Sequence, residues 1–206
     1  MCEFFSPIVT RDLKIIHCAD IEDSHERVIE KYKLKDDKLE NRDFVRLELT
    51  SKDENIFNHK IENWDYKEDE TDTLPQWYKD NIEEIKKKTY KELLKVFKKQ
   101  FLIDKTVDVL DTNIRFMNNC KVNILKSQVG EMCGNSQVGG MYDNSQVDKI
   151  WGNSQVGEMW GSSQVGEMCD SNTINIWSKD CKIKKREGGK TVVIKRYLKK
   201  IKVDIK

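Results

Sequence analysis

Histidine and cysteine are the residue types through which this chain could perform catalysis or bind a metal. The chain has three histidines and six cysteines, and Cys2, His17, Cys18 and His25 lie near its start. These four could be imagined as a zinc site, but zinc sites usually pair Cys or His about two to five residues apart. Cys18 beside His17 or His25 could instead be a nucleophile with its base. No oxyanion donor or third orienting residue accompanies them, so ordinary core or surface residues are the simpler interpretation.

Other motifs that carry chemistry are missing from the sequence. It contains no phosphate-binding glycine loop, no dinucleotide fingerprint and no His-Glu-x-x-His motif. The acidic run Glu68 to Glu70 falls in a predicted loop, where carboxylates are normally solvated. We therefore predict no catalytic residue, no cofactor and no metal, and we expect a protein that is not an enzyme and has no small-molecule substrate.

A nine-residue repeat occupies residues 127–171. Its five units begin at Ser127, Ser136, Ser145, Ser154 and Ser163. The third residue of each unit is Val and the sixth is Met or Ile, while the seventh is Cys, Tyr or Trp. Glycine or aspartate follows, and these residues tolerate the backbone conformation of a corner. Because valine favours extended backbone and one unit cannot bury its own Val and Met, the units should stack as a β-solenoid.

Two units would make one coil of eighteen residues, which fixes the expected columns of side chains. Val129, Val147 and Val165 would stack on one side, and Val138 and Val156 on the other. In the same register Cys133, Trp151 and Cys169 form one column. Tyr142 and Trp160 form another, with Trp177 nearby. Whether these aromatic columns are buried or exposed stays open.

A period of nine is also found in calcium-binding repeats, which carry an aspartate at a fixed position of each copy. Here the acids are Glu131, Glu158 and Glu167 at position five, and Asp143 and Asp170 at position eight. Neither position is acidic in every unit, which argues against calcium. An ice-binding solenoid would need a regular threonine array, and the invariant polar columns here are Ser and Gln.

The flanking sequence predicts three regions. Residues 1–104 read as a small α+β domain, residues 105–180 as the solenoid with decayed end copies, and residues 181–206 as a basic β-strand tail or cap. In the first region we expect strands over 4–10, 13–18 and 44–49, and a weaker one over 56–64. A short helix follows a capping box at 23–26, and a long helix with one apolar stripe covers 76–100. After the turn Gly188–Gly189, strands are expected over 191–198 and 201–205.

Charge is unevenly distributed although the formal net charge is only +1. The repeats carry 6 acidic residues and 1 basic residue, whereas residues 181–206 carry 11 basic and 2 acidic residues. Neither a signal peptide nor an apolar run of about 18 residues is evident, so we expect a cytoplasmic protein with free thiols and no membrane partner.

Exposed aromatic and charged side chains of the solenoid and the tail are the candidate partner-binding residues. Aromatic columns on a solenoid face would form a protein-binding surface, and buried columns would form core. The predicted partner-binding residues are Glu131, Tyr142, Trp151, Glu158, Trp160, Glu167, Lys184, Lys185 and Arg186.

Several segments of the first region resemble a group of uncharacterised phage and prophage proteins, in which a small α/β domain precedes a short-period repeat tail. The segments are Cys2–Asp12, Lys14–His17, Asp23–Glu26, Phe44–Glu48 and Pro75–Tyr78. The resemblance covers roughly residues 2–80 in detail, and it implies an origin in a phage or mobile element. Small proteins of that origin often bind and block host machinery, including CRISPR nucleases. The resemblance implies no catalytic residue.

The expected function is therefore that of a non-enzymatic binding protein in the host cytoplasm. Its sharpest form is an anti-CRISPR-like inhibitor that evades host defence by blocking a nuclease, with or without guide RNA. One alternative is a structural or oligomer-forming module of a virion or scaffold. Another is a nucleic-acid or nucleotide binder that uses the basic C-terminal segment.

Overall fold

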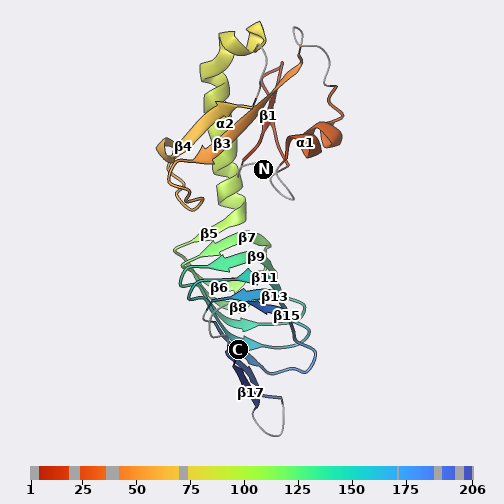
Figure 1. Cartoon of the computed structure of the whole chain (residues 1–206), viewed down its shortest axis with the longest axis vertical. Helices are drawn as coiled ribbons and strands as arrows, with labels where there is room; N and C mark the ends of the chain where they lie inside the picture. The colour runs from red at the N-terminus through yellow and green to blue at the C-terminus, as the bar shows by residue number, and fades with distance from the viewer. Residues whose placement is uncertain are drawn as a thin grey trace. The chain divides into compact units, whose positions relative to one another are not determined.

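The chain forms two compact units, Met1–Lys98 and Lys99–Lys206 (Figure 1). The computed structural model describes residues 5–18, 24–35, 42–69, 74–170, 172–187, 192–197 and 202–205. Within these residues, no helix is both long enough and apolar enough to cross a membrane.

An antiparallel sheet with strand order β2-β1-β3-β4 organises the N-terminal unit. Its strands are β1 (Ile8–Thr10), β2 (Ile15–Ile16), β3 (Phe44–Ser51) and β4 (Trp64–Glu68). The expected hairpin around Arg11 is confirmed, since Ile8 pairs with Ile16, and so is the strand that begins at Phe44. The part of the predicted first strand before Phe5 lies outside the described residues.

The weaker strand expected over residues 56–64 is wrong. That stretch is a loop and a 3-10 helix, Ile61–Asn63, and β4 begins only at Trp64. The Asp53 carboxylate accepts hydrogen bonds from Ser51 Oγ, Asn55 N and the side-chain amides of Asn58 and Asn63. These donors, Asn63 first, hold the pKa of the Asp53 carboxyl well below its usual range. Asp and Asn side chains thus satisfy backbone and side-chain groups locally and replace the strand.

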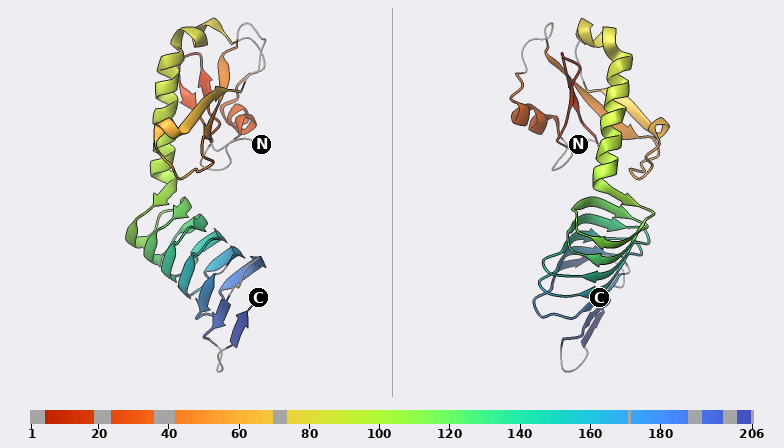
Figure 2. Two further views of the ribbon diagram at one scale, coloured as in Figure 1. Left: turned by 60° about the vertical axis from the view of Figure 1, so that its left-hand side comes forward. Right: turned by 180° about the vertical axis from the view of Figure 1, so that it is seen from behind.

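Two helices complete the N-terminal unit, α1 (His25–Tyr32) and α2 (Gln76–Gln100). The side chains of β3 alternate between two buried clusters, as the period of a strand requires. Val45 and Leu47 pack with Tyr78 and Ile85 of α2. Phe44 packs with Val28 of α1, and that cluster also contains Ile8, Ile16 and Cys18. Figure 2 shows α2 running along the sheet.

Two parallel sheets form a β-solenoid in the second unit (Figure 2). Successive strands from β5 to β16 alternate between them, and β17 joins the same sheet as β16. The odd sheet contains β5 (Phe101–Ile103), β7 (Ile114–Asn118), β9 (Gln128–Cys133), β11 (Gln146–Ile150), β13 (Gln164–Cys169) and β15 (Lys182–Glu187). The even sheet contains β6 (Thr106–Leu110), β8 (Lys121–Leu125), β10 (Gln137–Met141), β12 (Gln155–Met159), β14 (Thr173–Ile176), β16 (Val192–Lys195) and β17 (Lys202–Ile205).

The expected coil of eighteen residues is confirmed inside the repeats. Val147 pairs with Val129 on one side and with Val165 on the other, and Val138 pairs with Val156. The coils before the repeats are shorter, because Ile114 pairs with Val129 only fifteen residues later and Val122 with Val138 sixteen residues later. After the repeats the length is kept, since Val165 pairs with Ile183 eighteen residues later. The stacked Val, Met and Ile side chains of both sheets form one continuous buried core.

The backbone conformation at position eight of each unit explains why only glycine and aspartate occur there. Gly134, Asp143, Gly152, Gly161 and Asp170 all have positive φ, between 59° and 67°. Glycine adopts this left-handed conformation without steric cost, and Asp and Asn tolerate it better than most residues. The strand of each unit is therefore followed by a corner with the same backbone conformation.

The basic segment after the repeats continues the solenoid. Although no strand was expected over Lys182–Glu187, β15 pairs in parallel with β13, and Ile183 lies beside Val165. β16 and β17 lie within the two stretches predicted to be strands, and they pair antiparallel with each other. The predicted turn Gly188–Gly189 lies outside the described residues.

Candidate binding surface of the solenoid

A column of alternating charge runs along the outside of the odd sheet. The strand register places Glu131, Lys149, Glu167 and Lys185 in successive rungs. Glu167 lies 3.8 Å from Lys149 Nζ and 3.2 Å from Lys185 Nζ. The hydrogen bond from Lys185 lowers the pKa of the Glu167 carboxyl. One of the predicted partner-binding acids, Glu167, is therefore paired with two neighbouring lysines.

The three basic residues predicted to bind a partner occupy different surroundings on β15. Lys184 is exposed, and Lys185 contacts both Glu167 and Glu187. Arg186 lines a cavity of about 300 Å³ that also contains the apolar side chains of Ile183 and Val193. The structure therefore does not gather these residues into one uniform basic patch.

Aromatic side chains stack at the corner that follows the even sheet. We call Tyr142, Trp160 and Trp177 the aromatic corner. Trp160 N donates to Met141 O and Trp177 N to Met159 O, each at 2.9 Å, which puts the three residues in successive rungs. The rings of Trp160 and Trp177 are stacked, with centroids 5.2 Å apart and planes 9° from parallel.

Polar contacts hold the two tryptophan rings of the aromatic corner. Trp160 Nε1 donates a 2.9 Å hydrogen bond to Glu158 Oε2, and the Arg196 guanidinium lies 5.7 Å from the ring centre of Trp177. The Trp160 side chain is still 36% exposed. The aromatic corner is thus an ordered and accessible surface.

The second expected column behaves differently. Trp151 N donates to Met132 O, so Trp151 follows Cys133 in the next rung, and Cys169 follows in the rung after that. Trp151 is 40% exposed beside Lys149, whereas Cys133 is buried and Cys169 half-buried. Only one large ring of this column therefore reaches the surface, and it has no aromatic neighbour in the column.

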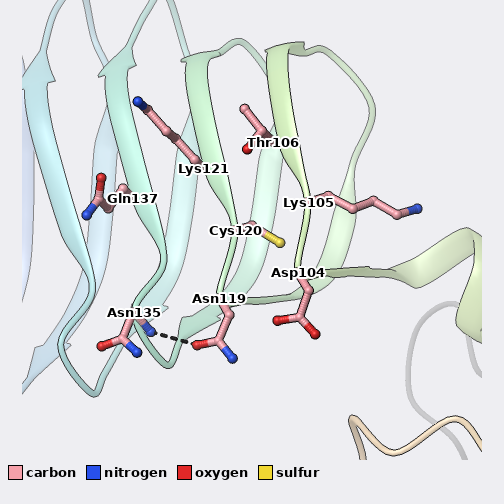
Figure 3. A pocket seen from close by; sticks show the side chains of 8 residues that line it. All are labelled: Asp104, Lys105, Thr106, Asn119, Cys120, Lys121, Asn135 and Gln137. Carbon is pink, nitrogen blue, oxygen red and sulfur yellow. Dashed lines mark hydrogen bonds between the residues drawn. The ribbon is translucent and has the colours of Figure 1, made fainter.

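A polar pocket of about 360 Å³ follows one corner of the first coils (Figure 3). Asn135 N donates to Asn119 Oδ1 across the rungs, and the Cys120 thiol donates to Asn118 O. Burial raises the pKa of the Cys120 thiol. The eight labelled side chains include no histidine, so this cysteine has no imidazole base within the pocket. The hydrogen bonds across the rungs indicate a structural role for these side chains.

The thiols of the solenoid are expected to react at different rates. Burial, with Glu131 next, raises the pKa of Cys133 to about 12, whereas Cys169 and Cys181 are only half-buried. Because the thiolate is the reactive form, Cys133 and Cys120 should be alkylated by iodoacetamide much more slowly than Cys181 in the native protein. Mass spectrometry of the labelled peptides measures this. Equal labelling of Cys133 in native and urea-unfolded protein would contradict the prediction.

The residues first considered for chemistry are not assembled as imagined. His17 contacts the ring of Phe5, Cys18 is buried in the apolar cluster around Val28, and Cys2 lies outside the described residues. The two ring nitrogens of His25 contact Leu47 O and Asp69 rather than Cys18.

The cluster that His25 does form was missed by the sequence analysis. Among the described residues, His25, Glu48 and Asp69 offer ligand atoms that all lie within 4.8 Å of one another. The alternation of side chains along β3 could have placed Glu48 on the same side of the strand as Phe44. Nothing in the sequence links either residue to Asp69.

The geometry of the solenoid thus distinguishes two kinds of surface. The outer face of the odd sheet carries paired charges, and the corner beyond the even sheet carries ordered aromatic rings. Comparisons of the chain with protein-family models, curated proteins and solved structures find no match.

Proposed function

We propose that the chain is a non-enzymatic binding protein whose solenoid presents the aromatic corner to a protein partner. The observation that carries this proposal is the stacked and partly exposed pair of Trp160 and Trp177. Large aromatic side chains supply most of the binding energy in many protein interfaces. Because Glu158 already holds the ring of Trp160, little conformational freedom remains to be lost on binding.

The solenoid supports this role as a stiff scaffold. Neighbouring strands are hydrogen-bonded along both sheets, and the Val and Met columns between them are buried. The spacing of the rings is then set by the backbone, about 4.8 Å per rung. We also propose that the basic segment from β15 to β17 closes the last coil and adds the exposed Lys184 as a cationic contact.

We propose a host defence nuclease as the partner and inhibition as the outcome. This choice rests on the resemblance of residues 2–80 to phage proteins, and it places the protein in the host cytoplasm. Because Glu167 is paired with Lys149 and Lys185, we favour binding through the aromatic corner over mimicry of an acidic nucleic acid. The partner surface should therefore be apolar, with a cation able to contact Glu158.

Removing the aromatic pair should abolish binding. In plasmid-cleavage assays with a panel of purified CRISPR nucleases, the wild-type chain is expected to slow at least one enzyme. The double variant Trp160→Ala/Trp177→Ala should bind that enzyme roughly 30-fold or more weakly, since interface anchors contribute at least about 2 kcal/mol. Circular dichroism checks that the solenoid still folds.

Trp151→Ala provides the matched control for this experiment. Trp151 is exposed to a similar degree but lies in the other column, so its loss should change binding by less than about threefold. A panel in which no nuclease is slowed contradicts the proposed partner. A double variant that inhibits as well as the wild type contradicts the proposed surface.

An oligomer-forming role is the second candidate. β15 is the last strand of the odd sheet among the described strands, and the outer edge of such a strand can pair with another chain. Light scattering during size-exclusion chromatography tests this role. A monomer at the highest concentration used in the binding assays rules it out and leaves the binding proposal intact.

A further inference from the structure

The N-terminal unit brings an imidazole and two carboxylates together from three separate elements. His25 is the first residue of α1, Glu48 lies in β3, and Asp69 directly follows β4. One ligand atom from each lies within 4.8 Å of the other two. The His25 side chain is only 3% exposed, whereas Asp69 is 53% exposed, so the cluster opens to solvent on the Asp69 side.

Local structure fixes each of the three side chains. Ser24 caps α1 by accepting a hydrogen bond from Arg27 N, which sets the position of His25 in the first turn. Glu48 shares the α1 face of β3 with Phe44, because alternate residues of a strand point to the same side. Asp69 N donates to Arg46 O at 3.0 Å, which extends the pairing of β4 with β3 as far as Asp69.

The hydrogen bond between His25 and Leu47 decides which ring nitrogen faces the carboxylates. Nε2 lies 2.9 Å from Leu47 O, and since a carbonyl oxygen only accepts, Nε2 carries a proton. The other nitrogen, Nδ1, lies 3.2 Å from Asp69 Oδ2. In a neutral imidazole Nδ1 presents a lone pair, which repels a carboxylate unless a cation lies between them. A backbone carbonyl on the opposite nitrogen is the usual way in which proteins orient a metal-binding histidine.

We propose that His25 Nδ1, Glu48 and Asp69 bind a divalent first-row transition-metal ion. The three groups supply one nitrogen and two carboxylate donors, a set that suits a divalent ion. Two ligand atoms 3.2 Å apart, each about 2.1 Å from an ion, subtend an angle of about 100° at it, between octahedral and tetrahedral values. Imidazole with carboxylates suits Zn²⁺, Fe²⁺ and Mn²⁺, and water would fill the remaining positions. This site lies outside the solenoid and does not depend on the proposed binding function.

Calorimetric titration of the full, chelator-stripped chain with ZnCl₂ and with MnCl₂ tests the proposal. We expect one Mn²⁺ and at least one Zn²⁺ per chain. The manganese titration is informative because free thiols compete for Zn²⁺ but not for Mn²⁺. Asp69→Asn should weaken Mn²⁺ binding at least tenfold. Removing a side chain that only hydrogen-bonds to a metal ligand already lowers metal affinity by about tenfold or more, and losing a charged ligand should lower it further.

Asp65→Asn is the matched control, because Asp65 is a similarly exposed carboxylate of β4 that pairs with Lys52. It should leave Mn²⁺ binding unchanged. The competing state is a protonated His25 in an ion pair with Asp69, and NMR of the His25 ring distinguishes the two. Loss of the ring signals with paramagnetic Mn²⁺ in the wild type, but not in Asp69→Asn, supports the site. Equal Mn²⁺ binding by wild type and Asp69→Asn, or a ring unaffected by the metal, overturns it.

Discussion

Replacing Val147 with aspartate is expected to unfold the central coils of the solenoid. Val147 is fully buried in β11 and lies between Val129 and Val165 in the odd sheet. A carboxylate there has no described basic partner in the core column and must lose its hydration. A buried unpaired charge costs about 3–5 kcal/mol, which is a large part of the roughly 5–15 kcal/mol that stabilises a typical protein.

The position within the array increases the effect. Each coil of a solenoid is stabilised by its two neighbours, so a defect in a central coil weakens two interfaces. Hydrogen exchange measured by mass spectrometry should show lost protection in β9, β11 and β13. Peptides of the N-terminal unit report on any indirect effect, since that unit is a separate compact body.

The matched control introduces aspartate at an exposed position of β12, the next strand in the sequence. Gln155 is exposed at position two of its unit in β12, and Gln155→Asp should change stability by less than about 1 kcal/mol. Asp148, which directly follows Val147, already shows that an exposed aspartate is accepted in this part of β11. Unchanged protection of β11 in Val147→Asp would contradict the assignment of Val147 to the core.

The solenoid was predictable because its signal is repeated. Val at position three and a corner former at position eight recur five times, and together they specify strand, corner and coil length. The column of Tyr142 and Trp160 was predicted from the same coil length of eighteen residues. The exposure of these rings did not, because it depends on how far each corner turns and on contacts such as that of Trp160 with Glu158.

Elements without a repeated pattern were harder to predict. The strand expected over residues 56–64 was replaced by a loop built on Asp53, since side-chain hydrogen bonds compete with strand pairing. β15 was missed because Ile183 is its one apolar residue, and Arg186 occupies the position that the buried Met168 has in β13. The cluster of His25, Glu48 and Asp69 joins residues distant in sequence, and only the pairing of β3 with β4 brings two of them together.

The long helix α2 shows the same limit at the level of single residues. The sequence places both Leu93 and Leu94 in its apolar stripe, because the apolar residues recur at mixed spacings of three and four. In the structure Leu93 is fully buried, whereas Leu94 is 40% exposed. Periodicity therefore identifies the buried side of α2 but cannot separate adjacent residues at its margin.

Leu93→Ala is accordingly expected to destabilise the N-terminal unit far more than Leu94→Ala. Truncating a buried leucine costs about 2–5 kcal/mol, because the transfer free energy is lost and a cavity remains. Truncating Leu94 should cost less than about 1 kcal/mol, since much of its surface is already hydrated and alanine favours helix slightly more. Both variants replace a leucine with alanine at adjacent positions of one helix. The change in helix propensity is therefore the same in both, and the difference between them reports on burial. Hydrogen exchange in β3 and α1 measures the outcome, and equal losses of protection in the two variants would show that the leucines are equally buried.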